Sequence, residues 1–328
     1  MTVLEDQLYA ARARVEALEP DDHSEGARRT LEAFGGWCRA LGLWEEALKA
    51  YDRGLRLCEP ENDPTEVSRF LTWKSNVFFH SGIYGRAVEF ATQAVSVSPT
   101  DLEKAGRMSY FLGLPHLMLG DISNYVSLQQ QALDILPTAP EDERERRVAW
   151  YRTRLAKGLL LQGDADDARQ LIAEQVHAFR QTNPKFGLPW AQLVRGAVEV
   201  ELSNFAEAEA ALAESLSIYE RNQQEAYVVD VLTEQSKLAV AQGEPRQAVA
   251  LAEQAVAEAR KGPRVRGGLA DTRHLNFALA QAARAYLEIR DRERAAAAYD
   301  EALRLAAATN RGLIMRDLLR LGISKALR

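Results

Sequence analysis

Residues 41–55 read LGLWEEALKAYDRGL, and related stretches recur along the chain, for example SGIYGRAVEFATQAV from Ser81 and QGEPRQAVALAEQAV from Gln242. When the recurrences are aligned, one position is alanine in all but one of them. That position contains Ala47, Ala87, Tyr125, Ala168, Ala208, Ala248 and Ala295. The spacings of 40, 38, 43, 40, 40 and 47 residues between these positions indicate a repetitive array rather than a chain of conventional domains.

Two further columns of small residues follow from the same alignment. Twelve residues upstream stand Gly35, Ser75, Gly113, Ala156, Gly196, Ser236 and Ala283. Seven residues downstream stand Gly54, Ala94, Ala132, Gln175, Ser215, Ala255 and Ala302, of which all but Gln175 are small. Small side chains let two helices approach closely where they cross, so the columns predict packed helix pairs.

A turn residue lies between the two helices of each predicted pair. It is a glycine in most of them and a larger residue in two: Gly42, Gly82, Gly120, Gly163, Ser203, Gly243 and Arg290. Glycine can end a helix in the left-handed conformation at low cost, so these residues mark the ends of first helices. Pro60, Pro99 and Pro137 end second helices in the early units.

This pattern of small residues, turn glycines and terminal prolines resembles the tetratricopeptide repeat, in a long-period variant with units near 40 residues. The resemblance covers about residues 24–310 and implies an all-α fold. We expect a right-handed α-solenoid of about seven helix pairs that forms a single superhelical domain over residues 1–328. Residues 1–23 are expected to form an N-terminal capping helix, and residues 311–328 a C-terminal one.

Composition and motifs narrow the classes of function. The chain has 41 Lys and Arg against 47 Asp and Glu, which excludes a wholesale basic surface. It contains no signal-peptide pattern and no apolar run of membrane-spanning length, and its two cysteines fit a reducing compartment. No nucleotide-binding, hydrolase or metal-binding motif occurs. We therefore expect a cytoplasmic, non-catalytic protein that uses no metal or cofactor, with a composition typical of bacteria.

In proteins that this array resembles, the first helix of each pair lines a concave groove that holds a peptide. The resemblance implies that positions two, five and nine of each unit face this groove. Position two contributes Arg29, Arg69, Arg107, Trp150 and Trp190; position five contributes Thr72 and Tyr110; position nine contributes Asn76, Lys157, Lys237 and Arg284. Guanidinium groups bind carboxylates through paired hydrogen bonds, and aromatic side chains often dominate binding energy.

A second interpretation of these residues stays open. Helices longer than usual can shift the register, so that the aromatic residues belong to the core between repeats. Each arginine then pairs with a neighbouring acid such as Glu32, Glu66 or Glu103.

The leading hypothesis is a scaffold whose partner is a protein or peptide, with an acidic or mixed peptide segment in the groove. The alternative is a sensor arm of a bacterial regulatory system that binds a signalling peptide or small effector. Nucleic-acid binding through the loop RKGPRVRGG, which starts at Arg260, is disfavoured by the overall negative charge.

Overall fold

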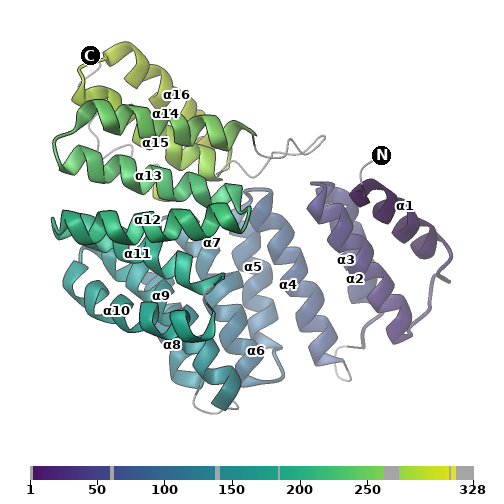
Figure 1. Ribbon diagram of the computed structural model, residues 1–328. Helices are drawn as coiled ribbons and strands as arrows, with labels where there is room; N and C mark the ends of the chain where they lie inside the picture. The colour runs from purple at the N-terminus through teal and green to yellow at the C-terminus, as the bar shows by residue number, and fades with distance from the viewer. Residues whose placement is uncertain are drawn as a thin grey trace. The chain divides into compact units, whose positions relative to one another are not determined.

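The computed structural model describes residues 3–59, 63–136, 141–183, 185–261, 273–309 and 312–314. All regular structure in these ranges is helical, with no β-strand among them (Figure 1). In chain order the helices are α1 (Val3–Glu16), α2 (Glu25–Ala40), α3 (Trp44–Arg56), α4 (Pro64–His80), α5 (Tyr84–Ser96), α6 (Asp101–Gly106), the π-helix η1 (Arg107–Leu112), α7 (Gly113–Met118), α8 (Ile122–Ile135), α9 (Glu141–Gln162), α10 (Ala165–Thr182), α11 (Gly187–Glu201), α12 (Phe205–Arg221), α13 (Glu225–Ala241), α14 (Pro245–Lys261), α15 (Arg273–Glu288) and α16 (Arg292–Ala308).

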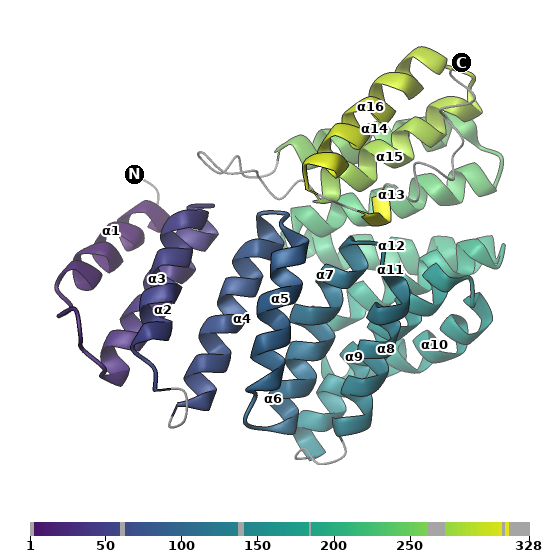
Figure 2. The ribbon, with the colours of Figure 1, turned by 180° about the vertical axis from the view of Figure 1, so that it is seen from behind.

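The helices pack as successive hairpins, which confirms the all-α prediction. Short turns join α2 to α3, α4 to α5, α9 to α10, α11 to α12, α13 to α14 and α15 to α16, and the members of each pair lie side by side (Figure 2). The chain forms two compact units, which divide within α7. Unit 1 contains the helices up to η1, and unit 2 begins at His116. A single superhelical domain and a total of seven repeats stay predictions.

The predicted columns of small residues lie at helix contacts within and between the hairpins. The whole column from Ala47 to Ala295 is 0% exposed. An added Cβ at Gly196 would lie 2.6 Å from Leu212, and one at Gly54 would overlap the buried ring of Phe70. The small residues are therefore needed because a neighbouring side chain occupies the space beside them.

Tyr125 is the one large residue of the alanine column, and a glycine on the next helix accommodates it. Tyr125 on α8 is fully buried, and an added Cβ at Gly158 on α9 would lie 3.2 Å from its ring. The weaker match of this unit to the repeat pattern is thus compensated by a substitution on the neighbouring helix.

The predicted turn residues adopt the left-handed conformation. Gly42, Gly82, Gly120, Gly163 and Gly243 have φ between 69° and 101°, and Ser203 and Arg290 follow them with φ of 60° each. This confirms the turn register, because the two exceptions have the backbone that glycine has elsewhere. Gln223, before α13, is a third such residue, with φ of 55°.

The π-helix η1 follows α6 directly and was not expected from the sequence. A π turn contains more residues than an α turn, so it rotates the residues before it relative to those after it. Arg107 and Tyr110, both expected in the groove, belong to this segment.

Helix α1 lies within residues 1–23, where a capping helix is predicted, and packs against α2 and α3, with Ala11 buried in a cluster that includes Cys38 and Tyr51. The expected C-terminal capping helix of residues 311–328 lies outside the described residues, except for a helical turn at 312–314. Leu313 and Ile314 are buried there. Among the described helices, none combines the length and the apolar character that crossing a membrane requires.

Candidate functional site

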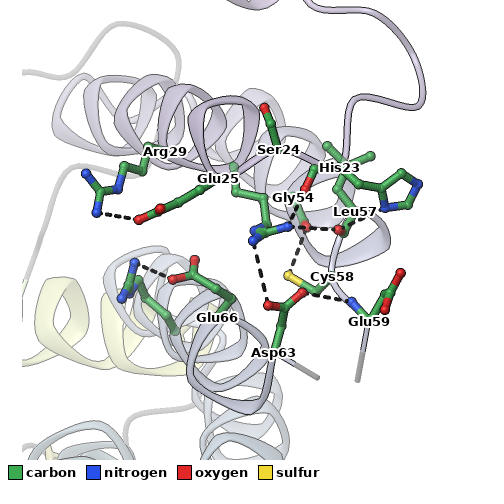
Figure 3. Close-up of polar contacts among 12 residues, drawn as sticks. His23, Ser24, Glu25, Arg29, Gly54, Leu57, Cys58, Glu59, Asp63 and Glu66 are labelled. Carbon is green, nitrogen blue, oxygen red and sulfur yellow. Dashed lines mark hydrogen bonds and ion pairs between the residues drawn. The ribbon is translucent and has the colours of Figure 1, made fainter. Parts of the chain in front are cut away.

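Two arginines of the predicted groove in unit 1 pair with acids near them. Arg29 on α2 lies 2.5 Å from Glu25, one turn earlier on the same helix. Arg69 on α4 lies 2.9 Å from Glu66 and 3.6 Å from Glu32, which belongs to α2. Figure 3 draws the contacts of Glu25 and Glu66.

Arg107 is the third arginine, and its side chain is only 11% exposed. Its Nε donates to Thr72 Oγ1 at 3.0 Å, and its guanidinium lies 3.7 Å from Glu103. Burial lowers the pKa of Arg107, Glu103 opposes this shift, and Arg69 adds to it. Each of these three arginines therefore has an acidic neighbour, as the second interpretation of the sequence described.

Position five was expected to face the groove, but its threonines do not face solvent. Thr72, Thr153 and Thr233 are buried, and each hydroxyl donates to the carbonyl four residues earlier, at 2.7 to 2.8 Å. Tyr110 differs, with 36% exposure and its ring 4.9 Å from that of Phe111. The three threonines therefore lie within the helix packing.

Asn76, at position nine of α4, is also buried. Its side-chain oxygen has no hydrogen-bond partner in the described structure.

A polar cluster that sequence reasoning missed joins the segment before α2 to the end of α3 (Figure 3). Arg28 donates to the carbonyl of His23 at 2.6 Å and lies 3.7 Å from Asp63, while His23 Nδ1 lies 3.1 Å from the carbonyl of Leu57. The cluster ties connecting segments together within unit 1. The sequence signal for this cluster was weak: it consisted of the position of Arg28 next to the predicted site residue Arg29.

In unit 2 the predicted residues on α9 and α11 come together. Trp150 and Trp190 stack with their ring centroids 5.4 Å apart and their planes 20° apart. The guanidinium of Arg154 lies 5.8 Å and 5.7 Å from these two rings, which is cation–π distance. Phe179 packs edge-on against Trp150, and both tryptophans stay partly exposed.

Charged side chains of α13 and α15 pair with one another, and two acids of α13 act electrostatically on Lys157 of α9. His274 Nδ1 lies 2.7 Å from Asp230 Oδ1, and Lys237 Nζ lies 2.8 Å from Glu234. Burial alone would raise the pKa of Asp230, but His274 and Lys157 outweigh it and hold that pKa below its ordinary value. Lys157 on α9 therefore acts electrostatically on an acid of α13.

Lys157 itself is half-buried. Burial lowers its pKa, and the attraction of Asp230 and Glu234 does not fully offset this effect. We call Trp150, Arg154, Lys157, Trp190, Asp230, Lys237 and His274 the α9–α15 face. Arg284 is the last predicted residue; it lies exposed on α15 and makes no ion pair with the described residues.

Of two members of this face that were not predicted, one has a signal in the sequence and the other depends on the fold. Asp230 occupies position two of its unit, the register that Trp150 and Trp190 share. His274 lies on the first helix of the last unit, three residues before position two, and only the fold brings it to Asp230.

A hollow of about 660 Å³ lies elsewhere in unit 2, between α8, α9 and α10. Leu133, Leu155 and Leu171 are among its lining residues, and Arg152 and Glu174 form an ion pair of 3.2 Å at it. In the part of the chain that the structure describes, no group of three or more His, Cys, Asp or Glu residues is arranged to hold a metal ion.

Comparison with known proteins places the repeats. Tetratricopeptide repeat models match residues 30–65 and residues 278–309, which contain α2–α3 and α15–α16. No curated protein sequence matches the chain.

Several solved structures share the fold at low identity. A tetratricopeptide repeat protein from Parabacteroides merdae is 16% identical over 90% of this chain and 98% of its own, with a TM-score of 0.58. Aspartyl phosphate phosphatase F from Bacillus subtilis is 13% identical over 84% of this chain and 70% of its own, with a TM-score of 0.62. A Rap protein in complex with competence and sporulation factor is 14% identical over 99% of this chain and 98% of its own, with a TM-score of 0.56. The repeat models that match two of the hairpins, together with the shared helical-hairpin fold, support the assignment of the chain to the tetratricopeptide repeat superfamily.

Proposed function

We propose that the protein is a non-catalytic scaffold that binds a mixed-charge peptide segment on the α9–α15 face of unit 2. The observation that carries the proposal is the stacked pair Trp150 and Trp190, which is partly exposed and has the guanidinium of Arg154 at cation–π distance. Flat aromatic surfaces supply large contact areas at little cost in side-chain entropy. Charged groups beside them contribute more to the specificity of binding than to its affinity.

The distribution of charge favours a mixed rather than a purely acidic peptide. Basic groups on this face include Arg154, Lys157 and Lys237; Asp230 is its acid, and Glu234 lies beside Lys237. A uniformly acidic segment would meet Asp230 and Glu234 with like charge. A peptide that carries both signs can place each beside its opposite.

The fold comparison agrees with this proposal in general terms. The Rap protein that shares the fold is in complex with competence and sporulation factor. A scaffold that holds a segment of another protein and a sensor that holds a signalling peptide would use the same face. The length of peptide required for full affinity distinguishes these two roles.

Fluorescein-labelled hexapeptide mixtures, grouped as acidic, basic, neutral and mixed, test the proposal by fluorescence anisotropy. We expect saturable binding of the mixed group, lost in the double variant Trp150→Ala/Trp190→Ala. Trp73→Phe is the matched control, because Trp73 lies in unit 1 and donates to Glu32 at 2.8 Å. Absence of binding by every group, or full binding by the double variant, would overturn the proposal.

A further inference from the structure

The helical turn at residues 312–314 joins the two ends of unit 2. In a solenoid each repeat packs only against its neighbours. Along the chain, the hairpins α9–α10, α11–α12 and α13–α14 separate α7 and α8 from α15 and α16. Residues 312–314 come after α16, yet the backbone of Gly312 lies against the turn between α7 and α8, at Leu119 and Gly120. Figure 2 shows residues 312–314 as the short yellow segment beyond the end of α16.

This close approach requires glycine on both sides. A Cβ added to Gly312 would overlap the carbonyl oxygen of Leu119. A Cβ added to Gly120 would lie 2.9 Å from the carbonyl carbon of Gly312. Overlap with backbone atoms cannot be relieved by rotating a side chain, so glycine is the residue that permits two backbones to come this close. Gly120 therefore has a role besides its left-handed turn, because it also admits residue 312.

The two residues after Gly312 anchor the segment at the other end of unit 2. Leu313 is 3% exposed and Ile314 is 1% exposed. Ile314 belongs to the apolar cluster that contains Leu279 of α15 and Tyr299 of α16. Gly312 thus contacts the first turn of unit 2, while Ile314 is buried among its last helices. Residues only two positions apart therefore hold the two ends of unit 2 together.

The turn that receives Gly312 is held in shape by its own hydrogen bonds. One carboxylate oxygen of Asp121 accepts from the backbone N–H of Asn124 at 3.3 Å and so caps α8. The other carboxylate oxygen lies 2.9 Å from His116 Nδ1. These contacts do not involve residues 312–314, so the turn can keep its shape when the segment leaves it.

We propose that residues 312–314 are a latch that holds unit 2 closed and that opens without unfolding the hairpins. The latch consists of three residues, whereas successive hairpins pack along whole helices. Opening the latch therefore disrupts much less packing than separating two hairpins would, and local openings of this kind occur at lower free energy than global unfolding. Opening releases the turn between α7 and α8 from the end of α16, and the curvature of the array can then change. This inference does not depend on the proposed function.

Distances between two spin labels test the latch. The labels are attached at Ser123→Cys and Ala307→Cys, exposed positions near the start of α8 and the end of α16, and measured by double electron–electron resonance. The two native cysteines are buried. The labelled protein is compared with Gly312→Val, which blocks the approach to the turn, and with Ile314→Ala, which weakens the anchor. Gly85→Val is the matched control, because an added Cβ there has no neighbour within 4 Å.

We expect Gly312→Val to lengthen and broaden the distance distribution. Hydrogen exchange in residues 119–121 and 312–314 should become at least about tenfold faster, because each segment loses the cover of the other. Exchange in α9–α12 should stay unchanged, which shows that the hairpins remain folded. Ile314→Ala should cause a smaller change in the same direction, and Gly85→Val none.

Two results would overturn the inference. The first is an unchanged distance and unchanged exchange in Gly312→Val, which would show that the contact does not hold the ends together. The second is an equal loss of protection throughout unit 2, which would show that residues 312–314 belong to the cooperative core and cannot open separately.

Discussion

The two units are built from the same repeat but differ in whether the charged side chains of its first helices have counter-ions close to them. In unit 1 position two holds Arg29, Arg69 and Arg107, and each lies within 4 Å of a glutamate three or four residues earlier in the chain. In unit 2 the same position holds Trp150 and Trp190, which stack on each other. In unit 1 the arginines are therefore paired with acids, whereas the α9–α15 face of unit 2 presents aromatic surface and a lysine without a close partner.

The difference follows from where the acids stand relative to the bases. In unit 1 a glutamate precedes each arginine by three or four residues, a spacing that puts both side chains on one face of a helix. In unit 2 the lysine at position nine of α9 has no such acid, and the nearest carboxylates belong to α13. A charge is therefore available to a ligand where the helix does not supply its own counter-ion.

The largest effects are expected where each unit packs most tightly. Gly54→Val should destabilise unit 1 and Gly196→Val unit 2, each by about 3 kcal/mol, because the new side chain overlaps buried Phe70 or Leu212. Denaturant unfolding followed by hydrogen exchange measures both. We expect protection to fall first in α2–α5 for Gly54→Val and in α11–α12 for Gly196→Val. Equal loss throughout the chain in both variants would show that the two units unfold as one.

Replacing the two partly buried cations by methionine should change stability in opposite directions. Arg107→Met loses the hydrogen bond to Thr72 and should lower the free energy of unfolding by about 1–2 kcal/mol. Lys157→Met removes a charge without a close partner and should raise it by about 1 kcal/mol at neutral pH. Chemical denaturation checks both values, and a loss of stability in Lys157→Met would contradict the contrast between the faces.

The pH dependence sharpens the same contrast. Because the pKa of Lys157 is lower in the folded than in the unfolded protein, the unfolded chain binds more protons between the two values. Stability of the intact protein should therefore rise with pH as it approaches 10.5, the ordinary value of the group. Lys157→Met should lack this rise, so its advantage should shrink in alkaline buffer. If the difference in unfolding free energy between the intact protein and Lys157→Met stayed constant across that pH interval, Lys157 would be excluded as the source of the pH dependence.

Smaller effects are expected at the turns, which also differ between the units. Unit 1 has glycine at its left-handed turns, as at Gly82, whereas unit 2 includes Ser203 and Arg290 in that conformation. Ser203→Gly and Arg290→Gly should each raise the free energy of unfolding by about 0.5–1 kcal/mol, and Gly82→Ser should lower it by a similar amount. Thermal unfolding measures these shifts. Destabilisation by both glycine substitutions would show that the native side chains make contacts worth more than the backbone strain.

The smallest signal is expected from the thiols, both of which lie in unit 1. Burial raises the pKa of Cys38 to about 12 and that of Cys58 to about 11, and Cys58 also donates to the carbonyl of Gly54 at 3.3 Å. Neither should react with a disulfide reagent at about pH 8 in the folded protein, because the thiolate is the reactive form. Both should react after unfolding in denaturant. Rapid labelling of the native protein would reveal opening of unit 1.

Sequence reasoning predicted the hairpins because their determinants are local. A small residue at a helix crossing and a left-handed residue at a turn are needed whatever surrounds them. The alignment thus located the buried column from Ala47 to Ala295 and identified Ser203 and Arg290 as turn residues that are not glycine. It also named the acids beside the arginines, because helical spacing alone brings Glu66 to Arg69.

Only the tertiary structure decided which predicted site residues share a face and which are buried. Thr72 lies in the core and not in a groove, and η1 changes the phase at Arg107 through a backbone pattern that residue types do not signal. His274 meets Asp230 across 44 positions of sequence, and Lys157 acts on Asp230 across two helix pairs. Such pairings depend on how successive hairpins stack, which is a sum of many small packing angles. The order and spacing of small residues and turn residues therefore determined the repeat. The stacking of the repeats determined the candidate site.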